Sequence, residues 1–226
     1  MKRLLITTIL LHVGFCSLAK EVKPPLMASG TVVWAGLDYS MVRMIGANEF
    51  KSADAIFPSM LERWNTLFIY ERSQKVESAL GKLMIVDIGG VTERNKTASP
   101  KQIILTPGPT DTMEQSHITQ RDIAAEVRSY KLEKTNGLGL VFIVDRLGPH
   151  KQTGVGPRAE THMGFGGAVY VVFFDVATRE VISAEREIHQ AGGSGFRNLW
   201  FGVIKRTDES LSKYRQPGAH GRKSSR

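Results

Sequence analysis

A glycine-rich turn before the last expected helix carries the residues best suited to binding an anion. Residues 192–195 read Gly-Gly-Ser-Gly and Arg197 follows in the first helical turn, so backbone N–H groups and a guanidinium could converge on a phosphate. The spacing differs from a P-loop. Asn198 stands where the dinucleotide fingerprint has its third glycine, and Phe196 where a nucleophile elbow has its last glycine. We therefore favour a structural turn capped by Ser194, and keep Ser194 and Arg197 as candidate ligand-binding residues.

The histidines after residue 20 are scattered and no pair has helical metal-ligand spacing. They are His117, His150, His162, His189 and His220. We expect most of them at the surface. One alternative brings His150, His162 and Ser194 together from two loops, residues 146–167 and 192–197, as in a secreted hydrolase or a small-ligand-binding protein. His162 is thus the third candidate ligand-binding residue. We predict no catalytic residue, no metal ligand and no cofactor.

Four expected strands end in aspartate or pass into it: Asp38, Asp87, Asp145 and Asp175. If three of these strands are parallel, their carboxylates could meet at one end of the sheet and hold a hard cation. No Asp-x-Asp spacing supports a metal site. Aspartate is also a common turn and cap residue, because its side chain bonds nearby backbone N–H groups. We favour this second interpretation.

The first residues have the pattern of a secretory signal peptide. Lys2 and Arg3 precede an apolar run over residues 4–15, and Ser17 and Ala19 are small residues at the positions that a signal peptidase reads. We expect cleavage after Ala19 and a periplasmic or secreted protein. Cys16 is the only cysteine, and Phe15 directly before it disfavours lipidation. Cleavage would remove this cysteine, so we expect no disulfide bonds. No later segment approaches the roughly 20 apolar residues of a membrane-spanning helix.

The net charge of +8 is concentrated at the two ends of the chain. Two cations lie in the first three residues and five in the last fourteen, with no acidic residue in either segment, which leaves +1 between them. A folded nucleic-acid-binding protein carries its excess charge on one face of the domain, so we expect no nucleic-acid partner. The tail mixes cations with glycine, proline and serine, and predicts disorder with at most peripheral membrane contact.

Hydrophobic patterning predicts an α+β (mixed α/β) fold in the order β-α-β-α-β-β-β-α. Expected strands cover residues 31–37, 83–88, 138–145, 168–174 and 180–188; expected helices cover 60–80, 119–131 and 196–214. About five strands should therefore form a mixed sheet with helices packed against it. We expect Gly81 to end the first helix, a possible break near Asn65, and Thr119 to cap the second helix. The three tryptophans should lie in the core.

Segments between these elements are expected to be irregular. Residues 92–117 have no sustained period apart from a short apolar run at 103–105, and residues 146–167 carry six glycines and two prolines, which favours a mobile loop. In the last strand, Ile182, Ala184 and Ile188 should face the core, and Ser183, Glu185 and Glu187 the solvent. We expect a signal peptide at 1–19, a linker at 20–29, one domain at 30–214 and a basic tail at 215–226.

The element order resembles the α/β domain of bacterial envelope proteins such as the TolB amino-terminal domain and the curli secretion channel subunit. More locally, residues 57–65, 169–175 and 191–200 are similar to uncharacterised secreted bacterial proteins. The leader, the absence of catalytic spacing and the two irregular segments lead us to expect a periplasmic or envelope-associated, non-enzymatic binding or scaffold protein with a protein partner. The alternatives are the secreted hydrolase or small-ligand-binding protein described above, and an outer-membrane assembly component.

Overall fold

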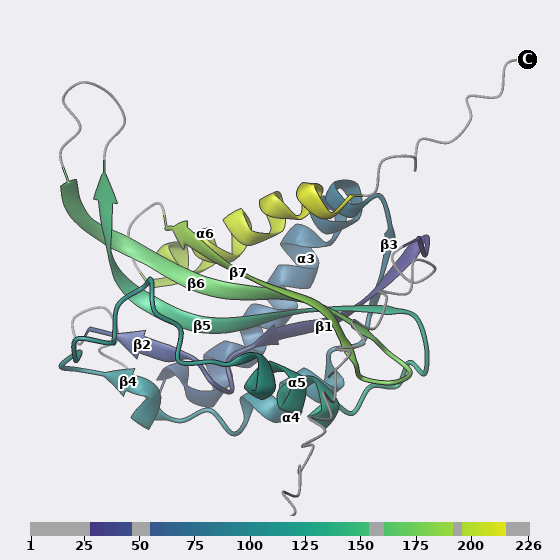
Figure 1. The fold of residues 1–226 in the computed structure, drawn as a ribbon, viewed down its shortest axis with the longest axis horizontal. Helices are drawn as coiled ribbons and strands as arrows, with labels where there is room; N and C mark the ends of the chain where they lie inside the picture. The colour runs from purple at the N-terminus through teal and green to yellow at the C-terminus, as the bar shows by residue number, and fades with distance from the viewer. Residues whose placement is uncertain (1–27, 47–54, 154–160, 192–195, 216–226) are drawn as a thin grey trace, which may run out of the picture.

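Strands and helices follow one another in an order close to the expected one (Figure 1). The structure is a computed structural model and describes residues 28–46, 55–153, 161–191 and 196–215. The predicted signal peptide, and most of the predicted linker and tail, lie outside these residues. The strands are β1 (Thr31–Asp38), β2 (Arg43–Ile45), β3 (Leu83–Val86), β4 (Ile103–Ile104), β5 (Leu138–Thr153), β6 (Thr161–Asp175) and β7 (Val181–Gln190). The α-helices are α3 (Leu61–Leu80), α4 (Gly89–Asn95), α5 (Gln120–Ser129) and α6 (Phe196–Ser210).

The sheet is built around β5, its longest described strand. One edge of β5 pairs with antiparallel β6 along its whole length. Its other edge must therefore hold both β1, at residues 139–143, and β2, at residues 146–147. β3 pairs with β1, β4 pairs with β2, and β7 pairs with β6. The seven described strands thus fill five positions, and the prediction of a mixed α/β sheet is confirmed.

Helices cover both faces of this sheet and bury two apolar clusters. On one face α3 and α6 pack over alternate residues of the central strands, including Trp34 and Phe142. The other face carries Val141 and Phe174 under α5. Strand β5 is buried on both faces, which explains why its sequence is apolar at successive positions. The predicted core positions of Trp34, Trp64 and Trp200 are confirmed, since each is at most 3% exposed.

The ends of two helices also form as predicted. Gly81 ends α3 in the left-handed conformation at φ 67°, and its N–H donates to the carbonyl of Glu77. Thr119 and Asp122 form a capping box at the start of α5. The described part of the chain has no helix long and apolar enough to cross a membrane.

Asn65 does not break α3, and instead completes the edge of β1. Its Oδ1 accepts a hydrogen bond from the Leu37 N–H at 2.7 Å, and its Nδ2 donates to the Leu37 carbonyl at 3.0 Å. Asn95 similarly accepts from the Tyr39 N–H at 2.6 Å. The partner strand β3 ends at Val86, opposite Trp34. The two buried amides therefore replace the missing strand beside the end of β1.

Residues 146–167 are not the irregular loop that we expected from their glycines, because most of them belong to β5 and β6. A Cβ at Gly148 would lie 2.8 Å from Ile45, and one at Gly167 would lie 2.8 Å from Leu147 and Val203. These glycines permit close packing inside the sheet. The segment 92–117 is also more ordered than expected, because it includes the end of α4 and strand β4.

The expected facing of β7 is wrong: Ile182 and Ala184 do not share a face, and Glu187 is more buried than Ile188. The register of β7 against β6 shifts between Val181 and Ser183, so Ile182 packs with the α3–α6 cluster and Ala184 with the α5 cluster. Glu187 is only 7% exposed, while Ile188 is 38% exposed. A β-bulge, which the alternating sequence does not reveal, inverts the pattern.

A substitution at Gly139 tests the packing between β5 and β6. A Cβ at Gly139 would overlap the ring of Phe174, which is completely buried. We expect Gly139→Ala to lower the free energy of unfolding by about 1–3 kcal/mol, as overpacked cores do. Gly30→Ala is the control, because no atom of the described residues other than its chain neighbours lies within 4 Å of its added Cβ. Urea denaturation of both variants measures the difference, and equal stability would contradict the packing described here.

Candidate functional site

Polar side chains gather where the parallel strands β1 and β2 pass along β5. The register of β5 against β6 shifts at Asp145, which allows consecutive side chains, Asp145 and Arg146, to reach the same group of residues. We name this group the arginine cluster; it consists of Arg43, Asp111, His117, Asp145, Arg146 and Arg186. Ligand sites in α/β sheets commonly lie at the carboxyl ends of parallel strands, so this cluster is a candidate site.

Asp145 is the fully buried centre of one half of the cluster. Arg186 Nε donates to its Oδ2 at 2.7 Å, and His117 Nδ1 lies 2.7 Å from its Oδ1 without hydrogen-bond alignment. Burial raises the pKa of the Asp145 carboxyl, but His117 and Arg186 outweigh this effect and hold the pKa below its usual value. Asp145 is therefore an anion held in place by Arg186 and His117.

Asp111 is the centre of the other half. Arg43 Nη1 donates to its Oδ1 at 3.0 Å, and Arg146 Nη1 donates to the same oxygen at 3.3 Å. The Gly108 N–H donates to Oδ2 at 2.9 Å. This backbone hydrogen bond, together with the two guanidinium groups, lowers the pKa of the Asp111 carboxyl. Two arginines from β2 and β5 thus share one carboxylate from the segment before α5.

The segment between β4 and α5 is held against the sheet by these contacts. Besides the bonds to Asp111, Arg186 Nη2 donates to the Met113 carbonyl at 2.6 Å. His117 Nε2 lies 2.8 Å from the Met41 carbonyl. Tyr170 Oη donates to the Ile118 carbonyl at 3.2 Å. The segment is ordered by polar groups of the sheet, with few apolar residues of its own, which is why its sequence shows no periodicity.

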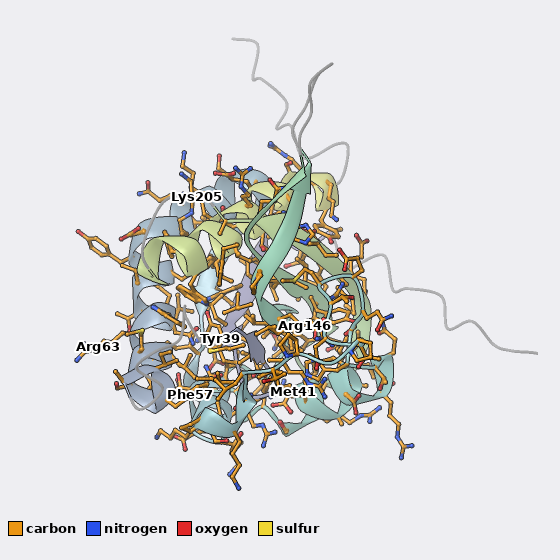
Figure 2. The ribbon with its side chains drawn as sticks, turned by 90° about the vertical axis from the view of Figure 1, so that its left-hand side faces the viewer. Tyr39, Met41, Phe57, Arg63, Arg146 and Lys205 are labelled. Atoms are coloured by element: carbon orange, nitrogen blue, oxygen red, sulfur yellow. The ribbon has the colours of Figure 1, made fainter. Side chains whose placement is uncertain are left out.

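A hollow of about 770 Å³ opens above one side of the cluster. Its wall is formed by the turn between β1 and β2, the segment after α4, and the segment before α5. The lining residues are polar for the most part: Ser40, Met41, Val42, Arg43, Thr97, Ser99, Lys101, Gln102, Ile104, Asp111, His117, Ile118 and Asp122. Figure 2 shows Met41 and Arg146 within the fold, whereas Arg63 and Lys205 extend from its periphery.

A second buried group of carboxyls lies behind Ser40. Asp38 accepts hydrogen bonds from Tyr130 Oη at 2.5 Å and from the Ser40 N–H at 2.8 Å. Burial, and then the negative charge of Glu126, raises the pKa of Asp38 to about 6. Glu126 itself forms a bidentate pair with Arg94. Asp38 is completely buried, so it has no direct access to a ligand in the hollow.

The hollow is lined by two serines and a histidine, and of these Ser40 and His117 are not arranged as a nucleophile and its base. Ser40 Oγ donates to Glu126 Oε1 at 3.2 Å. Both ring nitrogens of His117 already face acceptors, the Met41 carbonyl and the Asp145 carboxylate. A general base needs a free nitrogen within reach of the nucleophile. This arrangement suits binding of polar groups better than acyl transfer.

None of the three candidate residues from the sequence, Ser194, Arg197 and His162, is among the described residues of the arginine cluster. Ser194 lies outside the described residues. His162 is in β6, opposite Gln152, and Arg197 is in the first turn of α6, but the structure describes neither side chain. His150 is 3.8 Å from Glu114. The proposed grouping of these residues therefore stays a prediction.

The four aspartates have separate partners. Asp38 and Asp145 belong to the two buried groups above, Asp87 accepts from the Lys134 N–H at 2.8 Å, and Asp175 accepts from the Ala177 N–H at 2.8 Å in the turn before β7. Among the described residues no three His, Cys, Asp or Glu side chains lie close enough to hold a metal ion. Asp175 thus has the turn role that we favoured.

Sequence reasoning missed the arginine cluster. None of Arg43, Asp111 and Arg186 stands out in the sequence by its type or spacing. The available signal was the charged pair of Asp145 and Arg146 directly after a strand that is otherwise apolar. Charged residues at such a position are rarely buried without partners.

The far end of the β5–β6 hairpin forms a second candidate surface, which we call the ribbon. It consists of residues 150–153 and 161–164, joined as four pairs from His150 and Gly164 to Thr153 and Thr161. β2 pairs with β5 only as far as Leu147, and β7 reaches Gly166 on β6. In the described part of the chain no other strand pairs with the ribbon, and Figure 1 shows it extending beyond the body of the sheet.

Comparisons with known proteins give little guidance. No protein-family model and no curated protein matches the sequence. Among solved structures, the chain is similar to the hypothetical protein CT253 from Chlamydia trachomatis, with 15% identity, over 82% of this chain and 99% of that one, at a TM-score of 0.24. A likeness at this level supports no conclusion about fold or function.

Proposed function

We propose that the protein is a non-enzymatic binding protein of the cell envelope that contacts a protein partner through its ribbon. The observation that carries this proposal is the pair of strand edges in residues 150–153 and 161–164, which pair with no other described strand. The leader-like sequence at residues 1–19 and the resemblance to envelope domains support the location.

The physics of strand edges favours a partner for the ribbon. An isolated two-stranded hairpin is marginally stable in water. Its outer edges present N–H and C=O groups in the order that another strand requires. A partner that adds an extended segment would form a main-chain ladder on either edge. The ribbon also differs from the rest of β5 and β6, which have neighbouring strands and covering helices.

A hydrolase that uses the hollow is the weaker proposal, because Ser40 and His117 are already engaged with other groups and neither is prepared for nucleophilic attack. The alternative built on His150, His162 and Ser194 stays a prediction, since Ser194 lies outside the described residues. The outer-membrane assembly component remains compatible with a partner-binding ribbon, but nothing favours it separately.

Two deletions test the proposal. Replacing residues 151–163 by Asn-Gly would join His150 to Gly164 through a two-residue turn and remove most of the ribbon. Replacing only residues 154–160 by Asn-Gly would join the paired residues Thr153 and Thr161 and keep it. We expect the first variant to lose its partner and the second to retain it.

Photocrosslinking in the native host cells measures the contact. A photoreactive residue at Thr153 or Thr161 should give a discrete crosslinked protein, and one at Tyr70, which is 88% exposed on α3, should not. Both deletions should unfold cooperatively, because Phe165 and the core remain. A photoreactive residue at His150, which both deletions keep, should crosslink the partner in the smaller deletion and not in the larger one; the same crosslinked protein in both would refute the ribbon as the contact surface.

A further inference from the structure

We propose that the hollow above the arginine cluster binds a small oxyanion, a carboxylate or phosphate group of a ligand, through Arg43 and Lys101. The carboxylate of Asp111 competes with the ligand for the guanidinium group of Arg43. This site is separate from the ribbon and does not depend on the proposed protein partner.

The charge balance of the cluster leaves room for an anion. Among the described residues, the guanidinium groups of Arg43, Arg146 and Arg186 form ion pairs with two carboxylates, those of Asp111 and Asp145. Arg43 and Arg146 share Asp111, and Arg146 also lies 3.9 Å from Asp145, which is already engaged with Arg186. The charge of Glu114 also acts on Arg186, but its side chain is 64% exposed and lies within ion-pair distance of His150. Within ion-pair distance, three positive charges therefore share two carboxylates.

Arg146 shows the strongest sign of an incomplete set of partners. Its side chain is only 1% exposed, and within the described part of the chain its Nε–H has no hydrogen-bond partner, lying 3.9 Å from Asp145 Oδ1. A buried donor without a partner is costly. A second anion beside Asp111 would lower the cost of holding this guanidinium in the interior.

The hollow gives an anion access to this excess charge. Arg43 lines it with a side chain that is 38% exposed, and Asp111 with one that is 14% exposed. Lys101 lies on the same wall. Among the lining acids, Asp122 is already engaged by the Thr119 N–H and hydroxyl. A ligand carboxylate entering here meets two cations and one competing acid, Asp111.

The wall of the hollow is fixed before any ligand arrives. Gln102 Nε2 donates to the carbonyls of Tyr39, Ser40 and Val42, at 3.3, 3.1 and 2.9 Å. Its Oε1 accepts from the Ser99 N–H at 2.6 Å. One side chain thus ties the turn between β1 and β2 to the segment that carries Lys101. A preformed wall reduces the entropy lost when a ligand binds.

Calorimetric titration of the purified full chain tests the site. Sodium phosphate and sodium succinate are titrated in separate experiments, and sodium chloride at matched ionic strength corrects for screening. We expect at least one of the two oxyanions to bind. Tighter binding of phosphate would identify a phosphate-bearing ligand, and tighter binding of succinate a carboxylate ligand.

Three substitutions give the signature of the proposed competition. Asp111→Asn removes the internal carboxylate and should tighten oxyanion binding by about tenfold or more. Arg43→Gln in the Asp111→Asn background should weaken it by at least about tenfold. Lys205→Gln, on the opposite face of the sheet at α6, should leave it unchanged.

The proposal fails under either of two results. The first is that phosphate and succinate bind no more tightly than chloride, either to the wild-type chain or to the Asp111→Asn variant. The second is that Lys205→Gln weakens binding as much as Arg43→Gln, which would indicate a general charge effect. Arg43 is partly exposed, so its replacement leaves the core intact and a loss of binding can be attributed to the site.

Discussion

Replacing Arg72 by methionine is expected to lower the free energy of unfolding by about 3–5 kcal/mol, because it leaves a buried carboxylate without its partner. Arg72 of α3 donates from Nε to Asp208 Oδ2 at 2.5 Å and from Nη2 to Oδ1 at 2.6 Å. Asp208, on α6, is completely buried. Burial raises the pKa of its carboxyl even with Arg72 opposing the rise, so the charge depends on the guanidinium.

Chemical denaturation of single and double variants separates the causes. Arg72→Met together with Asp208→Leu should recover most of the loss, because two apolar side chains replace the pair in an apolar interface. Arg63→Met, at an exposed position of the same helix, should change stability by no more than about 0.5 kcal/mol. A loss below about 1 kcal/mol for Arg72→Met would mean that solvent reaches Asp208.

The second large effect has the opposite sign: Asp38→Asn should stabilise the protein at pH 7.5, by on the order of 1–3 kcal/mol. The pKa of Asp38 is raised to about 6, first by burial and then by Glu126. The folded state therefore binds more protons than the unfolded state between pH 4 and 6, roughly. Stability falls as the pH rises through this window, and the full penalty is present above it.

Asparagine removes the penalty and keeps the geometry. Its Oδ1 can still accept from the Ser40 N–H, and Tyr130 Oη can accept from its amide instead of donating to a carboxylate. Unfolding free energies at pH 4 and pH 7.5 measure the effect, which should be large only at the higher pH. Asp175→Asn, in the turn before β7, is the control and should stabilise at neither pH. A loss of stability for Asp38→Asn at pH 7.5 would show that the carboxylate is favoured at this position.

Most of the fold was predictable because its strands and helices carry their own local signals. β5 is apolar on successive residues, α3 has an apolar stripe and a glycine stop, and Thr119 starts α5 with a capping box. The helix α4 was missed, since it is short and begins with two glycines, which normally indicate a turn. The ribbon end of β5 and β6 was missed because the glycines and prolines of residues 146–167 also normally indicate an irregular segment.

The candidate site could not be derived from the sequence, because its partners meet only in the folded chain. Arg43 and Asp111 are 68 residues apart, and Asp145 and Arg186 are 41 residues apart. No spacing rule connects such pairs. A β-bulge at Asp145 turns the side chains of Asp145 and Arg146 toward these partners, and this bulge depends on the register between β5 and β6. The glycine-rich turn with Ser194 was a stronger sequence signal than any member of the arginine cluster.

The interruption between β1 and β2 has a mechanical consequence. Two of the five sheet positions are interrupted, between β1 and β2 at residues 39–42 and between β3 and β4 at residues 87–102, whereas β5, β6 and β7 run past this point. A load applied at the ribbon would therefore travel along the antiparallel strands, as along a beam. It would pass the short pairing with β2 at Leu147 and Arg146 and reach the bulge at Asp145 before β1 shared it. A pull by a bound partner would therefore reach the buried ion pairs of Asp145 and Arg146 before it reached the pairing between β5 and β1.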